Sequence, residues 1–192
     1  MSGNDADPPA PSVDVPDGWV ERETTTERVF SVSKVTVTAT TAVYDDERLR
    51  EQVETETGGG FRRFVFASRL RLRPSTKPSK PLTKLVTSRA KAGFADRLAD
   101  RGMADVTERE SRRFRVGDAE ATLVGYDASC VVAGTRLAVD GWVAVWPGDD
   151  GDYFVAGGAY PTRVLDSDDG FGGVVDPGRF RDDLFSIVRS VR

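Results

Sequence analysis

Residues 137–146 read LAVDGWVAVW, and this run indicates how the sheet of the protein is covered. In an extended strand, successive side chains point to opposite faces. Apolar side chains lie on both faces of this one, with Leu137, Val139, Val143 and Val145 on the first and Trp142, Ala144 and Trp146 on the second. Apolar surface is stable when it is removed from water, so such a strand needs a covering layer on each side. The run therefore predicts a central strand of a covered sheet.

Three further strand-like runs flank this one, and short polar turns join all four. The runs are 106–116, 119–133 and 153–160, and the turns fall at Gly117-Asp118, at Gly134-Thr135 and in PGDDGD, residues 147–152. Tight turns between valine-rich runs are typical of an antiparallel meander. Upstream, 19–23, 28–44 and 61–73 also have the composition of strands, and 28–44 is either one long strand or a bent pair. We expect about six strands in total.

Capping residues predict three helices around these strands. The first follows Asp45 or Asp46 and stops at Gly58, the second covers 82–102 between Pro81 and Gly102, and the third follows Asp176 with Pro177 at its first position. The second keeps apolar residues at helical spacing over most of its length. Together the elements predict an α+β fold, a mostly antiparallel sheet covered by three helices on one or both faces.

The first 17 residues, MSGNDADPPAPSVDVPD, contain four prolines and few side chains that can pack. They predict a disordered tail, followed by a single α+β domain over residues 18–192. The tail has neither the basic nor the apolar region of a signal peptide, and no apolar run approaches the ~20 residues that span a bilayer. We expect a cytoplasmic protein that does not associate with membranes.

Several stretches resemble known families. The start PDGW, the long central helix before a meander and the closing FRDDLFSIVRSVR are similar to the Mog1/PsbP-like α/β/α sandwich group. The run FASRLRLRP…LTKLVTSRA…GFADRLADRG…VDGWVAVWP…YFVAGGAYPTRV resembles conserved uncharacterised proteins of haloarchaea. The first resemblance implies a sandwich fold and a role as a binding module, and the second implies the host. Neither brings a catalytic motif.

The composition excludes several kinds of chemistry. The chain has no histidine and one cysteine, Cys130, so imidazole catalysis, internal disulfides and the usual zinc and iron sites are excluded. Cys130 shares its predicted strand face with Val124 and Val132 and is typical of a small core residue. We expect neither catalysis nor a cofactor. The 22 arginines against 5 lysines and 21 aspartates against 10 glutamates indicate a salt-adapted host.

Residues 166–176, DSDDGFGGVVD, approach the pattern of a calcium-binding loop. With Asp166 at the first loop position, Gly170, Phe171 and Pro177 fall at positions five, six and twelve, where an EF-hand needs an oxygen ligand, glycine and glutamate. Because the register fails at these positions, we expect no metal site. The stretch instead predicts a solvated acidic loop that ends in the N-cap of the last helix.

Arginines at odd-numbered positions of two predicted strands form a basic strand face. Residues 61–115 carry 16 basic and 5 acidic side chains between acidic flanks. If 61–73 and 106–116 are neighbouring strands, their arginines form one patch for an anionic partner such as nucleic acid. The candidate residues are Arg63, Arg69, Arg71, Arg73, Arg109, Arg113 and Arg115. The alternative, which we favour, is a solvated face or one paired with the acidic flanks.

An aromatic cluster is the second candidate site. Tyr126, Trp142, Trp146 and Tyr160 could frame a ligand pocket beside Gly157 and Gly158, which leave room on a neighbouring strand. Large rings that cover strand glycines are also ordinary core packing, which we favour here. We therefore expect a cytoplasmic binding module with an unidentified protein partner, and a nucleic-acid-binding protein as the alternative.

Overall fold

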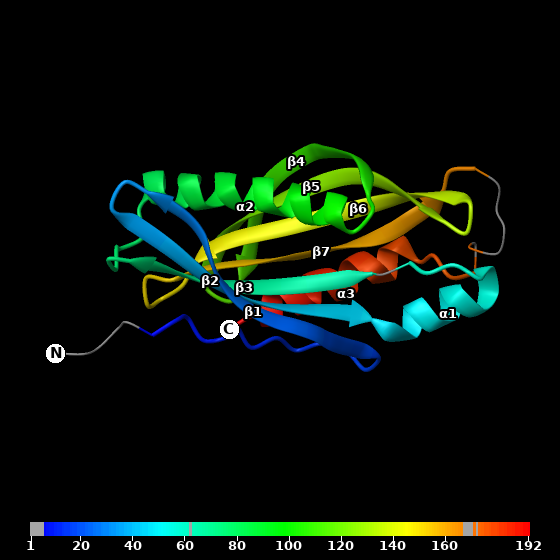
Figure 1. The fold of residues 1–192 in the computed structure, drawn as a ribbon, viewed down its shortest axis with the longest axis horizontal. Coiled ribbons are helices and arrows are strands. Elements are labelled where there is room, and N and C mark those ends of the chain that lie inside the picture. Colours follow the sequence, from blue (N-terminus) through cyan, green and yellow to red (C-terminus); the bar gives the residue numbers. More distant parts are fainter. Residues whose placement is uncertain (1–5, 62, 167–170, 172) are drawn as a thin grey trace.

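The computed structural model describes residues 6–61, 63–166, 171 and 173–192. Within these ranges lie seven strands: β1 (Trp19–Val32), β2 (Val35–Asp46), β3 (Phe64–Arg73), β4 (Ala104–Val116), β5 (Ala119–Val132), β6 (Thr135–Pro147) and β7 (Tyr153–Val164). The helices are α1 (Glu47–Thr57), α2 (Lys80–Asp100) and α3 (Pro177–Ser190). One antiparallel sheet joins the strands in the order β1-β2-β3-β7-β6-β5-β4 (Figure 1). The predicted α+β class and the C-terminal meander are confirmed.

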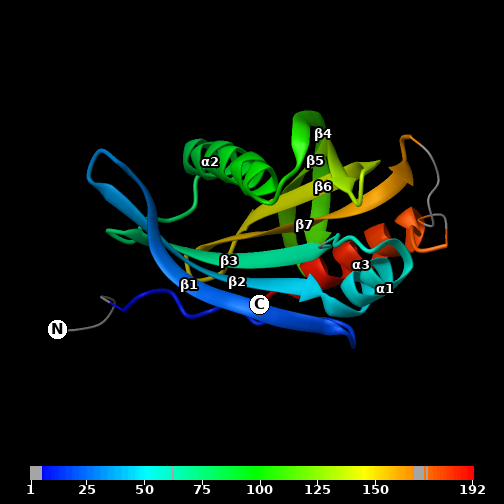
Figure 2. The same ribbon diagram turned by 45° about the vertical axis from the view of Figure 1, so that its right-hand side comes forward.

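The two long helices cover opposite faces of the sheet. Phe94 and Leu98 of α2 lie over Gly141 of β6 on one face. On the other face, Phe185 of α3 meets Trp142 edge-to-face at 5.4 Å between ring centroids. Figure 2 shows α2 above the sheet and α3 below it, with α1 beside α3. The strand that we expected to need two covering layers has both.

The strand count differs from the expectation of about six. Of our two alternatives for 28–44 the structure has the pair, because the chain reverses at Ser33 and Lys34, and residues 19–23 continue into its first half as β1. Ser33 takes a left-handed conformation with φ of 54°, a conformation that glycine or asparagine usually supplies. With neither residue at this position, the turn had no signal in the sequence.

Local capping signals, in contrast, set the helix boundaries. The Asp46 carboxylate accepts a hydrogen bond from the backbone N–H of Leu49 at 3.0 Å, and Gly58 ends α1 with φ of 72°. The Asp176 carboxylate accepts from the N–H of Arg179 at 3.1 Å, and Pro177 opens α3. The predicted ends of both helices are confirmed, while α2 begins at Lys80 and ends at Asp100, two residues before each expected end.

The N-terminal segment lies against the sheet over its described part, residues 6–17. Pro8 and Pro11 are buried, and the Thr40 hydroxyl donates to the Pro8 carbonyl at 2.5 Å. The backbone N–H of Ser12 donates to the carbonyl of Arg192 at 2.8 Å, and the N–H of Arg192 donates back at 3.0 Å. We expected residues 1–17 to be disordered, whereas the structure places residues 6–17 in contact with the domain beside the C-terminus (Figure 1).

Two long strands form the edges of the sheet. Most residues of β1 and β4 are exposed, and both strands are rich in charge. Each pairs with its inner neighbour through two irregularities in register, at Glu21/Glu23 and Arg28/Phe30 in β1 and at Ala104/Thr107 and Glu108/Glu110 in β4. Such bulges twist a strand and interrupt its ladder locally.

Candidate functional site

The seven candidate arginines do not lie together. β7, β6 and β5 separate β3 from β4, so the two basic strands are not neighbours as the patch hypothesis required. The sequence gives the face of each side chain through the alternation of a strand, but the sheet order depends on pairings between distant segments. The arginines therefore fall into three environments.

Arg63 is the most buried of them, with 2% of its side chain exposed. Its guanidinium donates to Asp46 at 3.1 Å, to Asp183 at 3.2 Å and to the Phe180 carbonyl at 2.8 Å. The group also lies over the rings of Trp19 and Phe180, 4.9 and 4.5 Å from their centroids. Burial lowers its pKa, and the two carboxylates oppose that effect. Arg63 thus ties α3 to the start of α1 and has no free surface to offer a partner.

Arg69 and Arg71 share the carboxylate of Asp152, which is 5% exposed. Arg69 donates to Asp152 at 2.7 Å and to Asp150 at 3.1 Å, and Arg71 donates to Asp152 at 3.0 Å. Both acids belong to the PGDDGD turn between β6 and β7. Arg73, next along β3, lies 3.7 Å from the Asp7 carboxylate. These contacts are the internal ion pairs that we favoured over an open basic face.

On β4, Arg109 donates to Asp127 at 2.6 Å and to Asp140 at 3.2 Å. Arg113 is 86% exposed and lies 3.7 Å from Glu120, and Arg115 is also exposed. All four arginines of β4 are exposed, Arg112 among them, but they lie apart from the arginines of β3 and so do not complete the seven-residue patch that we considered.

The aromatic candidates are divided by the sheet. Tyr126 faces α2, where its ring meets Phe94 at 5.4 Å. Trp142 and Tyr160 face α3, and the Trp142 indole N–H donates to the Tyr160 hydroxyl at 3.1 Å. Trp146 stacks on Phe154 at 5.6 Å. All four candidates are at most 4% exposed.

The two strand glycines do not leave a cavity beside these rings. A Cβ on Gly157 would lie 2.1 Å from the Trp142 carbonyl oxygen, and one on Gly158 would lie 2.2 Å from that of Phe64. Backbone therefore fills the space, and the rings are core residues. Burial raises the pKa of Tyr126 and of Tyr160 to about 12, as expected for phenols removed from water.

The acidic stretch 166–176 is described only in part, since 167–170 and 172 lie outside the described residues. Asp166 accepts from the backbone N–H of Arg136 at 3.2 Å, Phe171 is 1% exposed, and Asp176 caps α3. Among the described residues, no group of three or more acidic or cysteine side chains is arranged to hold a metal. The N-cap prediction is confirmed, and the loop prediction for the remaining acids stays a prediction.

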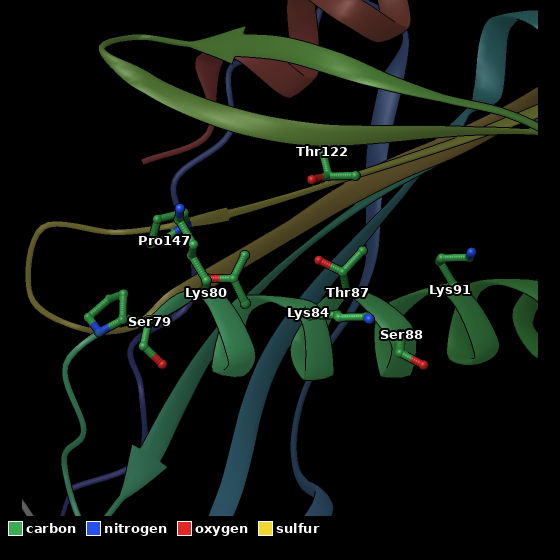
Figure 3. Close-up of a pocket in the computed structure, with 10 residues that line it drawn as sticks. Ser79, Lys80, Lys84, Thr87, Ser88, Lys91, Thr122 and Pro147 are labelled. Atoms are coloured by element: carbon green, nitrogen blue, oxygen red, sulfur yellow. The ribbon is translucent and has the colours of Figure 1, made fainter.

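A groove that we had not predicted runs along the N-terminal half of α2. We call it the lysine groove; its volume is about 710 Å³, and its lining is Pro78, Ser79, Lys80, Thr83, Lys84, Thr87, Ser88, Lys91, Thr122 and Pro147. Figure 3 shows the three lysines in a row along the helix, with Thr122 of β5 across the groove. Five of the lining residues carry hydroxyls, and none carries a carboxylate.

The lysines of this groove differ from the arginines in their partners. Lys91 is paired with Glu108 at 2.6 Å, but no described carboxylate lies within ion-pairing distance of Lys80 or Lys84. Both side chains are exposed. The positive end of the α2 dipole lies beside them, which adds to the positive potential. A signal for this site existed in the sequence, since four of the five lysines fall within residues 77–91 of an arginine-rich chain.

Cys130 lies away from this groove, on β5, and is 9% exposed. Burial raises the pKa of its thiol from 9.0 to about 11. The thiolate is the reactive form of cysteine, so this environment makes the side chain a poor nucleophile.

A family model, described as a domain of unknown function (DUF6517), matches residues 5–192. The chain belongs to the DUF6517 family. The match covers the described N-terminal segment as well as the sheet, so residues 6–17 are part of the DUF6517 domain. No curated protein matches the chain. None of the helices in the described part of the chain combines the length and apolar character that crossing a bilayer requires.

Proposed function

We propose that this DUF6517 protein is a non-catalytic binding module, and that its lysine groove binds a ligand that carries several phosphate groups. The observation that carries the proposal is the lining of the groove, three lysines and five hydroxyl residues without a carboxylate. Ammonium groups bind phosphate through charge, and hydroxyls donate hydrogen bonds to its oxygens.

The candidate arginines differ from the lysines of the groove in their ion pairing. Arg63, Arg69 and Arg109 each have a carboxylate within 3.2 Å, so their charge is already used inside the domain. Lys80 and Lys84 keep theirs, because no described carboxylate is in reach. The anionic partner that we considered for the arginine face is therefore better placed at the lysine groove.

The length of the groove favours an extended ligand. The groove extends along α2 from Lys80 to Lys91, which corresponds to about 16 Å of helix axis; Lys80 and Lys84 have no described carboxylate in reach, whereas Lys91 is paired with Glu108. A single phosphate group does not span that distance. A single-stranded nucleic acid or an inorganic polyphosphate does, and phosphate chemistry is common to both.

Fluorescence anisotropy with a short, labelled single-stranded RNA tests the proposal, with inorganic tripolyphosphate as competitor. We expect binding at low salt that weakens about tenfold or more in Lys80→Gln/Lys84→Gln. Because each lysine–phosphate contact adds about 0.7 to the slope of log K against log salt on single strands, the slope should fall by about 1.4. Tripolyphosphate should displace the RNA from the wild-type protein.

Lys34→Gln/Arg113→Gln is the matched control, since it removes the same charge from exposed positions outside the groove. Its affinity should stay within about twofold of wild type. Equal losses in the two double variants would mean that binding follows net charge and would refute the groove. Absence of RNA binding together with strong tripolyphosphate binding would support the phosphate chemistry and exclude nucleic acid as its source.

Support for a non-catalytic role comes from the side chains that the chain offers. It has no histidine, and its one cysteine is buried with a raised pKa. The layering, with α2 and α3 on opposite faces, supports a Mog1/PsbP-like architecture. We also propose a haloarchaeal host, which rests on the sequence resemblance and on the excess of aspartate and arginine in the composition, while the cytoplasmic location stays a prediction.

A further inference from the structure

A second hollow lies on the sheet side of α2, between that helix and strands β1, β2 and β3. We call it the amphipathic cleft, and its volume is about 350 Å³. The residues that matter for its chemistry are Thr41, Phe66, Ser68, Leu70, Gly93 and Arg97. None of them lines the lysine groove, so the two sites are independent.

The floor of the cleft is apolar with one polar spot. Phe66 and Leu70 are each 6% exposed and provide the apolar surface. Beside them, the hydroxyls of Thr41 and Ser68 hydrogen bond to each other at 2.7 Å. A hydroxyl has one donor and two acceptor positions, so this pair keeps hydrogen-bonding capacity for a ligand. The volume is within the range of small-molecule sites, and the lining combines this apolar floor with hydroxyl and charged side chains.

Arg97 forms one wall of the cleft. Its guanidinium lies over the Phe66 ring, 4.8 Å from the centroid, and is only partly exposed. None of its five N–H donors has a hydrogen-bond acceptor among the described residues, and no described carboxylate lies within ion-pairing distance. Burial and the charge of Arg101 lower its pKa, and the charges of Glu23, Glu27 and Asp100 oppose that effect. A planar, partly desolvated guanidinium with free donors is suited to a carboxylate.

Other charged groups around the cleft are Arg89, Glu27 and Asp96. Arg89 lies over the Phe30 ring at 5.6 Å, at the far end of the cleft. Glu27 and Asp96 are exposed, and neither is paired with Arg97. Arg89 also has no hydrogen-bond acceptor among the described residues, but it is exposed, whereas the half-buried Arg97 is the arginine that lies over the Phe66 floor.

Gly93 is the one glycine among the described residues that line the cleft. It lies inside α2, where glycine is less favourable than any residue except proline. A Cβ built on Gly93 meets nothing within 4 Å, so close packing does not require glycine there. Gly93 is exposed and lines the cleft, so a bulky side chain at this position would occupy open space beside it.

We propose that the amphipathic cleft binds a small amphipathic anion, with its apolar body on Phe66 and Leu70 and its carboxylate on Arg97. This site does not depend on the lysine groove. Decanoate serves as the probe, decanol as its uncharged match and decyltrimethylammonium as its cationic match. Displacement of a fluorescent naphthalene sulfonate dye from the folded protein measures all three.

We expect decanoate to displace the dye at least tenfold more effectively than decanol, and the cation to be weakest. Arg97→Gln should lose this preference for decanoate but keep the binding of decanol, and Arg97→Lys should fall between Arg97→Gln and wild type. Gly93→Leu fills the cleft with a good helix former and should weaken both ligands about tenfold or more while the melting temperature is retained. Lys80→Gln/Lys84→Gln should bind decanoate as wild type does.

Equal affinity for decanoate and decanol in the wild-type protein would overturn the role of Arg97. Dye displacement that Gly93→Leu leaves unchanged would place the ligand outside the cleft. Either result leaves the RNA experiment on the lysine groove unaffected, so the two proposals can fail separately.

Discussion

Replacement of Arg63, which directly precedes β3, by alanine should destabilise the domain more than loss of any arginine on β3 or β4. Arg63 was a candidate for partner binding, yet its side chain is 2% exposed and enclosed by Asp46, Asp183 and two aromatic rings. Truncation removes the only cation that the structure places on these carboxylates among the described residues. It also removes a hydrogen bond to the Phe180 carbonyl at 2.8 Å.

The magnitude follows from what the truncation leaves behind. The Asp46 side chain is 9% exposed, so its carboxylate would keep its charge in a poorly solvated place, whereas Asp183 is 33% exposed and can be hydrated. Breaking a buried ion pair by removal of one partner costs about 3–5 kcal/mol. For a domain of this size each kcal/mol lowers the melting temperature by about 2–4 °C, so we expect a decrease of roughly 6–20 °C.

Urea denaturation and thermal melting monitored by circular dichroism measure this change. Arg113→Ala is the matched control, because Arg113 is 86% exposed and should change the free energy of unfolding by less than about 0.5 kcal/mol. A loss of under about 1 kcal/mol for Arg63→Ala would show that water or rearrangement satisfies Asp46, and would refute the reasoning.

Three further predictions follow from buried groups. At about pH 8 the Cys130 thiol, with its pKa raised to about 11, should react with a disulfide reagent roughly a hundredfold more slowly in the folded than in the urea-unfolded protein; equal rates would contradict its burial. Gly157→Ala should cost about 3 kcal/mol in denaturation, because the new Cβ would meet the Trp142 carbonyl oxygen, whereas Gly93→Ala should not destabilise the fold. The pKa of Tyr160 is raised from 10.0 to about 12, so the unfolded chain loses this proton first, and stability should fall as pH rises from 10 to 12. Tyr160→Phe should reduce that fall in unfolding experiments, and an unchanged pH dependence would exclude Tyr160 as its source.

The parts of the fold that the sequence predicted are those with a local cause. Asp176 is the N-cap of α3 and Pro177 is its first residue, as predicted, and Gly58 marks the end of α1. The β4–β7 meander was also predictable, because each strand pairs with the next one across a short turn. The position of the turn at Ser33 could not be predicted, because its left-handed residue is a serine and not the glycine or asparagine that usually marks such a turn.

The candidate site depended on contacts that sequence spacing does not contain. Alternation along β3 correctly placed Arg69 and Arg71 on one face, but their partner Asp152 comes from a turn about eighty residues later. The face of Tyr126 could not be predicted either. Trp142 pairs with Gly125 and shares its face of the sheet, so Tyr126, the next residue, points to the opposite face. The lysine groove could have been anticipated from the clustering of lysines alone.

The two edges of the sheet have a consequence for how these molecules behave when crowded. An exposed edge strand presents free backbone groups to which a neighbouring chain can add a strand, and this is a route to aggregation. β1 and β4 oppose it, because their charged side chains and interrupted registers offer no flat, continuous ladder. The arginines of β4 that were candidates for partner binding therefore also disfavour pairing between the edge strands of neighbouring molecules.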